Sequence, residues 1–435
     1  MTSEANRVAG AQRGEPLSVE SGHDQRARAR SGWLVAGGII AAGLAIRIWL
    51  IRNYNDDPPD LRALQSVTAY LTHDFFHAYH ARNHVSGGLG AVSWTYPAGM
   101  FPLLLLDHIL VSSGLSFRSL IAIPNFLADA VMAVLAYRYL YTRRGRRFAL
   151  AGCALVSLGW PFVFDTGVMN QVDSQVTVFA VAAVMLWARA GRRDRVLACV
   201  CLGIATSVKL PFGFLALALL PTSEDWRESA RVVGIGAGIP ILMTAPFLIA
   251  DFHHVVTAID SNHGLPGFAG WGLFVDPAFR HVWLDQEQVR QSGPLRTLTH
   301  WQPEIVLAVL LPLGYFLWRR RVGAVHAAAI IALAVWASNV TPSLNFLVWV
   351  IPFLILDQQL WEAGAIELAG LIPAIQLFFL TPHPKAEILY VPVIAVMQTV
   401  IVVILARSLA KVVQNCPHRE ALPGGSRRFL GRVST

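Results

Sequence analysis

The chain has 435 residues, of which 54% are hydrophobic and 14% charged, and its formal net charge is +8. With its many apolar runs of bilayer-spanning length, this composition indicates a polytopic integral membrane protein. The positive charge is carried by arginines in short loops, so it indicates orientation and not a basic soluble face for nucleic acid. The four cysteines lie in apolar segments or in the basic tail, so the sequence predicts no disulfide framework.

Residues 1–32 are polar, arginine-rich and without apolar periodicity, so we expect a disordered basic cytoplasmic tail. The apolar run 33–51 is too long for a signal-peptide core and has no small-residue cleavage site, which predicts a retained signal anchor. A transmembrane domain is predicted over 33–406, followed by a basic cytoplasmic tail at 407–435.

Five arginine clusters predict the orientation, because positive charge accumulates on the cytoplasmic side. They lie at 143–147, 189–195, 227–231, 319–321 and 407–432. The apolar segments between them alternate at 148–164, 174–190, 231–250, 303–318, 322–338, 343–357, 363–380 and 388–406. We therefore expect an all-α transmembrane bundle of about 10–12 membrane segments with both termini cytoplasmic. Arginine is much more frequent than lysine, and both alanine and glycine are abundant. This composition favours a GC-rich bacterial genome and hence the bacterial cytoplasmic membrane.

Two regions contain apolar pieces divided by breaks. Residues 97–141 are interrupted at 112–119, and residues 196–221 at 209–211. The charges that flank the two regions require an odd number of membrane crossings in the first and an even number in the second. Re-entrant or broken helices satisfy this parity, and such backbone is tolerated at membrane depth only when it lies within protein or lines a polar cavity.

The second break contains Lys209, one of only three lysines in the chain. A charge at membrane depth costs about 2.5–3.5 kcal/mol even on the gentlest scale, which makes it a candidate functional residue. The alternative is a lysine that snorkels to an interface. The predicted orientation places Lys209 toward the outer side, together with the long loops 53–96 and 251–302. Because nucleotide sugars are absent there, an enzyme on this face would use a lipid-linked donor.

Four ordered stretches carry a family resemblance. They are Asp60-Leu61-Arg62 with the later Trp94-Thr95-Tyr96-Pro97, Pro124 to Asp129, Asn170 to Ser174 with Leu202 to Lys209, and Asn345 to Phe353. In this order they resemble the GT-C superfamily of integral membrane glycosyltransferases. The pattern is most similar to the first mannosyltransferase of GPI-anchor synthesis and to bacterial glycosyltransferase family 87. The chain departs from these relatives in having Asp56-Asp57 and then Asp60 where they often have a DxD or ExD pair.

The resemblance implies a glycosyltransferase that moves a sugar, mannose above all, from a polyprenyl-phosphate donor to a lipid or glycan acceptor. Asp60 matches the position of the catalytic base, with Asp57 and Asp56 as rivals; the alternative is a solvated, helix-capping loop. Lys209 would hold the donor phosphate as a point charge. The remaining expected substrate-binding residues are Asp173, Gln171, Asn170, Tyr96, Asp129 and Trp349. Helix capping is the alternative role for Asp173 and Gln171.

The histidines at 73, 77, 80 and 84 have a spacing compatible with metal ligation, but an interfacial amphipathic helix accounts for them as well. We therefore predict neither a cofactor nor a metal ligand. Loop arginines 280 and 296 could assist Lys209. A secondary transporter or a flippase for lipid-linked sugars is the alternative function, because transporters also use broken helices and buried charges. The two halves show no internal similarity, which favours the enzyme.

Overall fold

The computed structural model describes residues 22–53, 59–84, 91–189, 191–260, 270–275, 293–379 and 384–414. Within these ranges the secondary structure is helical except for one antiparallel ribbon, β1 (Arg82–His84) paired with β2 (Ala91–Ser93). The predicted all-α membrane bundle is confirmed, and the short ribbon is an addition within the loop predicted at 53–96.

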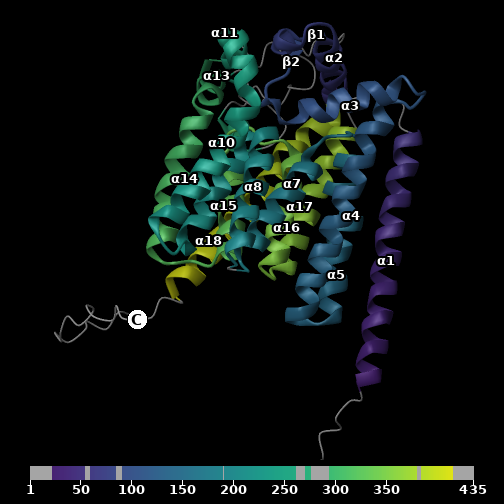
Figure 1. Ribbon diagram of the computed structural model, residues 1–435. Helices are drawn as coiled ribbons and strands as arrows, with labels where there is room; N and C mark the ends of the chain where they lie inside the picture. Colours follow the sequence, from purple (N-terminus) through teal and green to yellow (C-terminus); the bar gives the residue numbers. More distant parts are fainter. Residues whose placement is uncertain are drawn as a thin grey trace, which may run out of the picture.

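The helices of the bundle run side by side, as Figure 1 shows. They are α1 (Gly22–Asn53), α4 (Phe117–Arg144), α5 (Arg146–Leu158), α6 (Trp160–Gly167), α7 (Asp173–Trp187), α8 (Arg192–Val208), α9 (Ala216–Leu219), α10 (Trp226–Ala250), α14 (Gln302–Arg319), α15 (Ala324–Ser338), α16 (Leu347–Leu356), α17 (Leu360–Phe379) and α18 (Pro384–Gln414). Helix α1 begins at Gly22, inside the segment predicted to be a disordered tail, so helical structure extends through part of residues 1–32.

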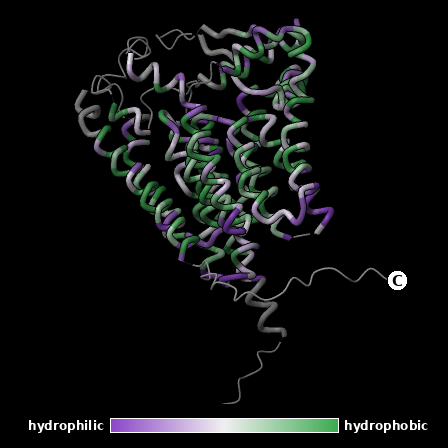
Figure 2. The backbone as a smooth tube through the Cα atoms, turned by 90° about the vertical axis from the view of Figure 1, so that its left-hand side faces the viewer, coloured by the Kyte–Doolittle hydropathy of each residue, from purple (hydrophilic) through white to green (hydrophobic). Residues whose placement is uncertain are grey.

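Five spans in the described part of the chain are long and apolar enough to cross a membrane. They are Arg30–Asn53, Phe117–Arg144, Arg146–Gly167, Trp226–Ala250 and Val391–Gln414. Shorter apolar helices, such as α7 and α15, lie among them. Figure 2 shows hydrophobic residues along the middle of the bundle and more hydrophilic ones toward its lower end. The chain is a multi-pass integral membrane protein.

One end of the bundle, at the top of Figure 1, carries the short elements and is called the loop end below. Its elements are α2 (Pro59–His73), η1 (Phe75–His80), the β1–β2 ribbon, η2 (Ala98–Met100), α3 (Phe101–Val111), α11 (Phe252–Asp260), η5 (Trp271–Phe274) and α13 (Gly293–His300). The turn between α4 and α5 and the end of α18 lie at the opposite end, called the arginine end.

Both predicted breaks are present. Helix α3 ends at Val111 and α4 begins at Phe117, so the first break falls within 112–119. Helix α8 ends at Val208, and the short helices η3 (Leu210–Leu215), α9 and η4 (Leu220–Thr222) follow. Arg195 at the start of α8 lies 3.2 Å from Glu224, just before α10. The chain between these two residues therefore returns to the end that it left, which is the predicted even number of crossings.

A buried arginine fastens α1 to the bundle. Arg47 is 1% exposed, and its Nε donates to Asp129 Oδ2 at 2.9 Å and to Thr166 Oγ1 at 3.0 Å. Its Nη1 donates to the carbonyl of Ser157 at 2.6 Å, near the end of α5. The last carbonyls of a helix have no partner within the helix and attract cations, so Arg47 satisfies groups that the end of α5 leaves open. A Cβ on Gly43 would lie 2.2 Å from the Ser157 oxygen, so this close approach requires glycine.

Candidate functional site

The Asn170–Ser174 stretch forms the turn between α6 and α7, and polar contacts with α4 fix its shape. Asn170 has φ +51°, in the left-handed region that asparagine tolerates better than most residues. Its Nδ2 donates to the carbonyl of Arg118 at 2.9 Å, and its Oδ1 accepts from Asn125 Nδ2 at 3.4 Å. Gln175 donates to Asn125 Oδ1 at 2.9 Å. Asn170 thus shapes the turn that presents Gln171 and Asp173.

Asp173 is fully buried and accepts from three side chains of distant segments. Its Oδ1 accepts from Lys209 Nζ at 2.6 Å and from Trp349 Nε1 at 2.6 Å. Its Oδ2 accepts from Asn345 Nδ2 at 2.9 Å, and the same Nδ2 also contacts Gln171 Oε1. Asn345 belongs to η7 (Leu344–Phe346), which leads into α16. A buried carboxylate is tolerable only with such pairing and hydrogen bonding, so this cluster holds α7, the break after α8 and the start of α16 in one arrangement.

Lys209 lies at the break, where the backbone is extended with φ −136° and ψ 111°. The residue is 4% exposed and its side chain ends on Asp173, so it does not reach out to an interface. Its ammonium lies 5.1 Å from the ring centroid of Tyr96, 5.4 Å from that of Trp349 and 5.9 Å from that of Phe346. Aromatic faces attract cations, most strongly where water is excluded. An ammonium has three N–H donors.

The segment that carries Tyr96 is held against the end of α8. The Tyr79 hydroxyl donates to the Tyr96 carbonyl at 2.9 Å. A Cβ on Gly99 would lie 2.4 Å from Ser207 Oγ, so glycine is needed where the segment contacts α8 two residues before Lys209. The amide of Ala98 donates to Thr244 Oγ1 on α10 at 3.3 Å. These contacts fix Tyr96 beside the ammonium.

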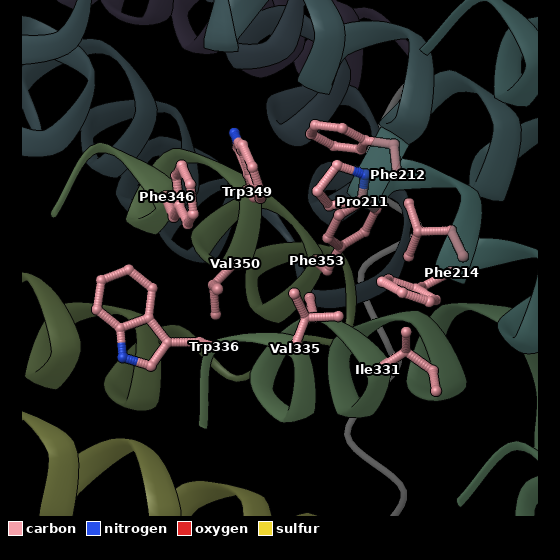
Figure 3. Close-up of a pocket in the computed structure, with 12 residues that line it drawn as sticks. Pro211, Phe212, Phe214, Ile331, Val335, Trp336, Phe346, Trp349, Val350 and Phe353 are labelled. Carbon is pink, nitrogen blue, oxygen red and sulfur yellow. The ribbon is translucent and has the colours of Figure 1, made fainter. Parts of the chain in front are cut away.

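An apolar pocket adjoins the Lys209 cluster (Figure 3). Its walls come from η3, α15, η7 and α16. The lining residues are Pro211, Phe212, Phe214, Leu215, Ile331, Ala332, Val335, Trp336, Phe346, Trp349, Val350 and Phe353. Phe346 and Trp349 stack with centroids 3.9 Å apart, and these same two rings face the Lys209 ammonium. The cation and the apolar pocket therefore share a wall, and the pocket itself is small, with a cavity volume of about 30 Å³.

The structure therefore brings together Lys209, Asp173, Gln171, Tyr96 and Trp349 among the predicted substrate-binding residues. Asn170 shapes the adjoining turn. Asp129 forms an ion pair with Arg47, and no direct contact between Asp129 and Lys209 or Asp173 is seen among the described residues.

The candidate bases are less defined. Asp60 is in the first turn of α2, where the structure describes the backbone. Asp56, Asp57 and Arg280 lie outside the described residues, as does the side chain of Arg296.

Three residues that contact predicted site residues had no predicted role themselves. Asn345 and Phe346 are in the last resemblance stretch, where Asn345 donates to Asp173 and Phe346 stacks on Trp349. Arg47 is a cation inside the first apolar run, and the reasoning that singled out Lys209 applies equally to it.

Two comparisons with known proteins give similarities. Residues 111–249, which include the Asn170–Ser174 turn and Lys209, match the family model described as dolichyl-phosphate-mannose-protein mannosyltransferase. The chain is also similar to the crystal structure of ArnT from Cupriavidus metallidurans bound to undecaprenyl phosphate, with 16% identity and a TM-score of 0.45 over 88% of this chain and 78% of that one. No curated protein matches the chain. The family match, over residues 111–249, agrees with the resemblance to the GT-C superfamily and leaves open the predicted closeness to family 87 and to the GPI mannosyltransferase.

Proposed function

We propose that this chain is a membrane glycosyltransferase of the GT-C superfamily, and that it transfers mannose from a polyprenyl-phosphate donor to a lipid or glycan acceptor. The reaction takes place at the loop end, on the extracytoplasmic face.

The observation that supports a polyprenyl-phosphate donor is the wall that the Lys209 ammonium and the apolar pocket share. A polyprenyl phosphate has an anionic head attached directly to an apolar chain. The head suits the Lys209 ammonium, and the aromatic wall beside it suits the first apolar atoms of the chain. A nucleotide-sugar donor would leave the aromatic and aliphatic lining without a partner. The family model that matches residues 111–249 is also named for a dolichyl-phosphate-mannose donor, which supports mannose as the sugar.

In the proposed reaction, the acceptor hydroxyl oxygen attacks the anomeric carbon of the donor sugar. The bond between that carbon and the phosphate oxygen breaks, and the hydroxyl proton passes to a carboxylate at the start of α2, for which Asp60 is the first candidate and Asp57 and Asp56 are the others. Negative charge develops on the departing phosphate, and Lys209 stabilises it in a site from which water is largely excluded. Asp173 holds the ammonium in place. The products are the glycosylated acceptor and polyprenyl phosphate.

The test is incubation of the purified full-length protein with labelled polyprenyl-phosphate-mannose and a crude lipid fraction, followed by identification of the labelled product. We expect label to move from the donor to an acceptor, in an amount that depends on the lipid fraction. At low donor concentration, transfer should fall roughly ten- to a hundredfold in Lys209→Met. If the wild-type protein moves the intact donor between leaflets of a vesicle and forms no new glycoside, the chain is a flippase and the proposal is wrong.

A further inference from the structure

Three potential metal ligands meet at the loop end, away from the Lys209 cluster. His80 is the last residue of η1, Asp251 follows the end of α10, and His254 is in the first turn of α11. One ligand atom from each lies within 4.8 Å of the others. Asp251 Oδ2 is 2.8 Å from His254 Nδ1 and also contacts His80 Nε2, and the two imidazole rings have centroids 3.8 Å apart. Two segments separated by some 170 positions thus direct three donor atoms at one point.

We propose that His80, Asp251 and His254 bind a divalent transition-metal ion of the Zn²⁺ type. Two imidazole nitrogens and one carboxylate oxygen are a typical three-residue donor set for zinc, whereas Mg²⁺ and Ca²⁺ prefer oxygen ligands alone. Three protein ligands leave at least one coordination position for water. All three residues are partly buried, so the ion would not be held by freely rotating surface side chains.

The surroundings of Asp251 prepare it for this role. Its second oxygen, Oδ1, accepts the backbone N–H of His254 at 3.2 Å, which orients the carboxylate and leaves Oδ2 directed at the two rings. Such outer contacts fix first-shell ligands in metal sites.

This set differs from the histidine series considered in the sequence. Of His73, His77 and His80, the members of that series whose side chains the structure describes, only His80 is in the cluster. His77 pairs instead with Asp74 at 2.8 Å. The other two ligands come from the loop after α10, which local spacing in the sequence cannot relate to His80.

The ion would tie η1 to α10 and α11. Tyr79 precedes His80 and donates to the carbonyl of Tyr96, whose ring faces Lys209. Phe247 of α10 packs against Tyr79, with 5.8 Å between the two ring centroids. A metal at His80 would therefore stabilise the segment that places Tyr96. It is a structural ion and takes no part in the proposed glycosyl transfer.

The test measures metal content and needs no glycosyltransferase activity. The purified full-length protein is equilibrated with micromolar ZnCl₂, desalted and analysed by inductively coupled plasma mass spectrometry. We expect about one zinc per chain in the wild-type protein and a roughly tenfold or greater loss in His80→Ala and His254→Ala. His253→Ala is the matched control, because His253 is adjacent and exposed and is not part of the cluster. It should keep its zinc.

A second measurement keeps the test decisive if a ligand variant does not fold. Titration of the wild-type protein with CoCl₂ should give saturable visible absorption bands of a bound Co²⁺ ion, and Zn²⁺ should displace them. Wild-type protein that binds neither metal overturns the proposal, as does equal zinc in the wild-type, His80→Ala and His254→Ala proteins. Metal binding by a protein without transferase activity would leave this proposal standing and count against the proposed function alone.

Discussion

Lys209 and Asp173 form a buried ion pair with 2.6 Å between Nζ and Oδ1, at the point where α8 breaks and α7 begins. Because the two charges offset each other, the pair can persist in an apolar bundle without a ligand. The ammonium uses one of its three N–H donors on Asp173, and in the proposed function the others bind the donor phosphate. The pair therefore places a cation at membrane depth and keeps it oriented.

Lys209→Met removes this cation and should weaken binding of the polyprenyl-phosphate donor roughly ten- to a hundredfold, the value of a charge-assisted contact of about 1.5–3 kcal/mol. The substitution also leaves Asp173 buried without its counter-ion, which costs stability on the order of 3–5 kcal/mol. Donor affinity, measured by displacement of a labelled polyprenyl phosphate, and thermal unfolding in detergent report the two effects separately.

The double variant Lys209→Met with Asp173→Asn separates binding from folding. It removes both charges and keeps a side-chain oxygen for the Trp349 indole N–H. We expect its stability to return toward that of the wild-type protein while donor affinity stays low. Donor affinity equal to the wild-type value in this variant would rule out a phosphate-binding role for Lys209.

Trp349→Phe should lower transfer by about tenfold, because it keeps an aromatic ring beside Lys209 and removes one charge-assisted hydrogen bond to Asp173. The control is Trp336→Phe. Trp336 lines the same pocket, but its indole N–H donates to Gln398 at 3.1 Å and not to Asp173. Initial rates at saturating acceptor should fall in the first variant and change less in the second. Equal effects would mean that pocket volume, and not the contact with Asp173, governs the rate.

Asp60→Asn tests the proposed base. The change keeps the shape of the side chain and removes its capacity to take up a proton, so transfer should be abolished while the detergent-solubilised protein stays monodisperse. Asp57→Asn should reduce transfer more mildly. The reverse order of effects would move the role to Asp57, and full activity in both would exclude these two carboxylates from catalysis.

The sequence predicts those features of the fold that depend on local composition. Apolar runs and arginine clusters determine where helices can cross a membrane, and α7, α15 and α16 lie within a few residues of their predicted positions. The break at Lys209 was also predictable, because a charge followed by Pro211 interrupts an apolar helix. The start of α1 at Gly22 could not be predicted, because the polar tail has no apolar periodicity.

The predictable part of the site is the set of residues inside the resemblance motifs. Lys209, Asp173 and Trp349 are 36 to 176 positions apart in pairs, and the motif order alone suggested that they act together. Contacts without a motif were missed. The His80–Asp251 contact joins residues 171 positions apart, and neither belongs to a periodic pattern that relates it to the other.

The orientation of the bundle is a prediction that cysteine labelling can test. In a background without the native cysteines, Ser113→Cys would lie exposed in the turn between α3 and α4 at the loop end, and Arg193→Cys would lie exposed at the arginine end. An impermeant thiol reagent added to intact cells should modify the first and spare the second. The opposite pattern would place the Lys209 cluster nearer the cytoplasm and remove the argument for a lipid-linked donor.

Arg47→Met should lower the free energy of unfolding by about 3–5 kcal/mol, because it leaves the buried Asp129 carboxylate without its counter-ion. It also removes the donor to the Ser157 carbonyl at the end of α5. Thermal unfolding in detergent, followed by the loss of monodisperse protein in size-exclusion chromatography, measures the effect. The double variant Arg47→Met with Asp129→Leu replaces the pair by apolar groups and should recover much of the loss, since such replacements of a buried pair are often neutral. This double variant also decides the role of Asp129. A stable and active protein makes Asp129 a structural partner of Arg47, whereas a stable protein with no transferase activity assigns it the predicted contact with substrate.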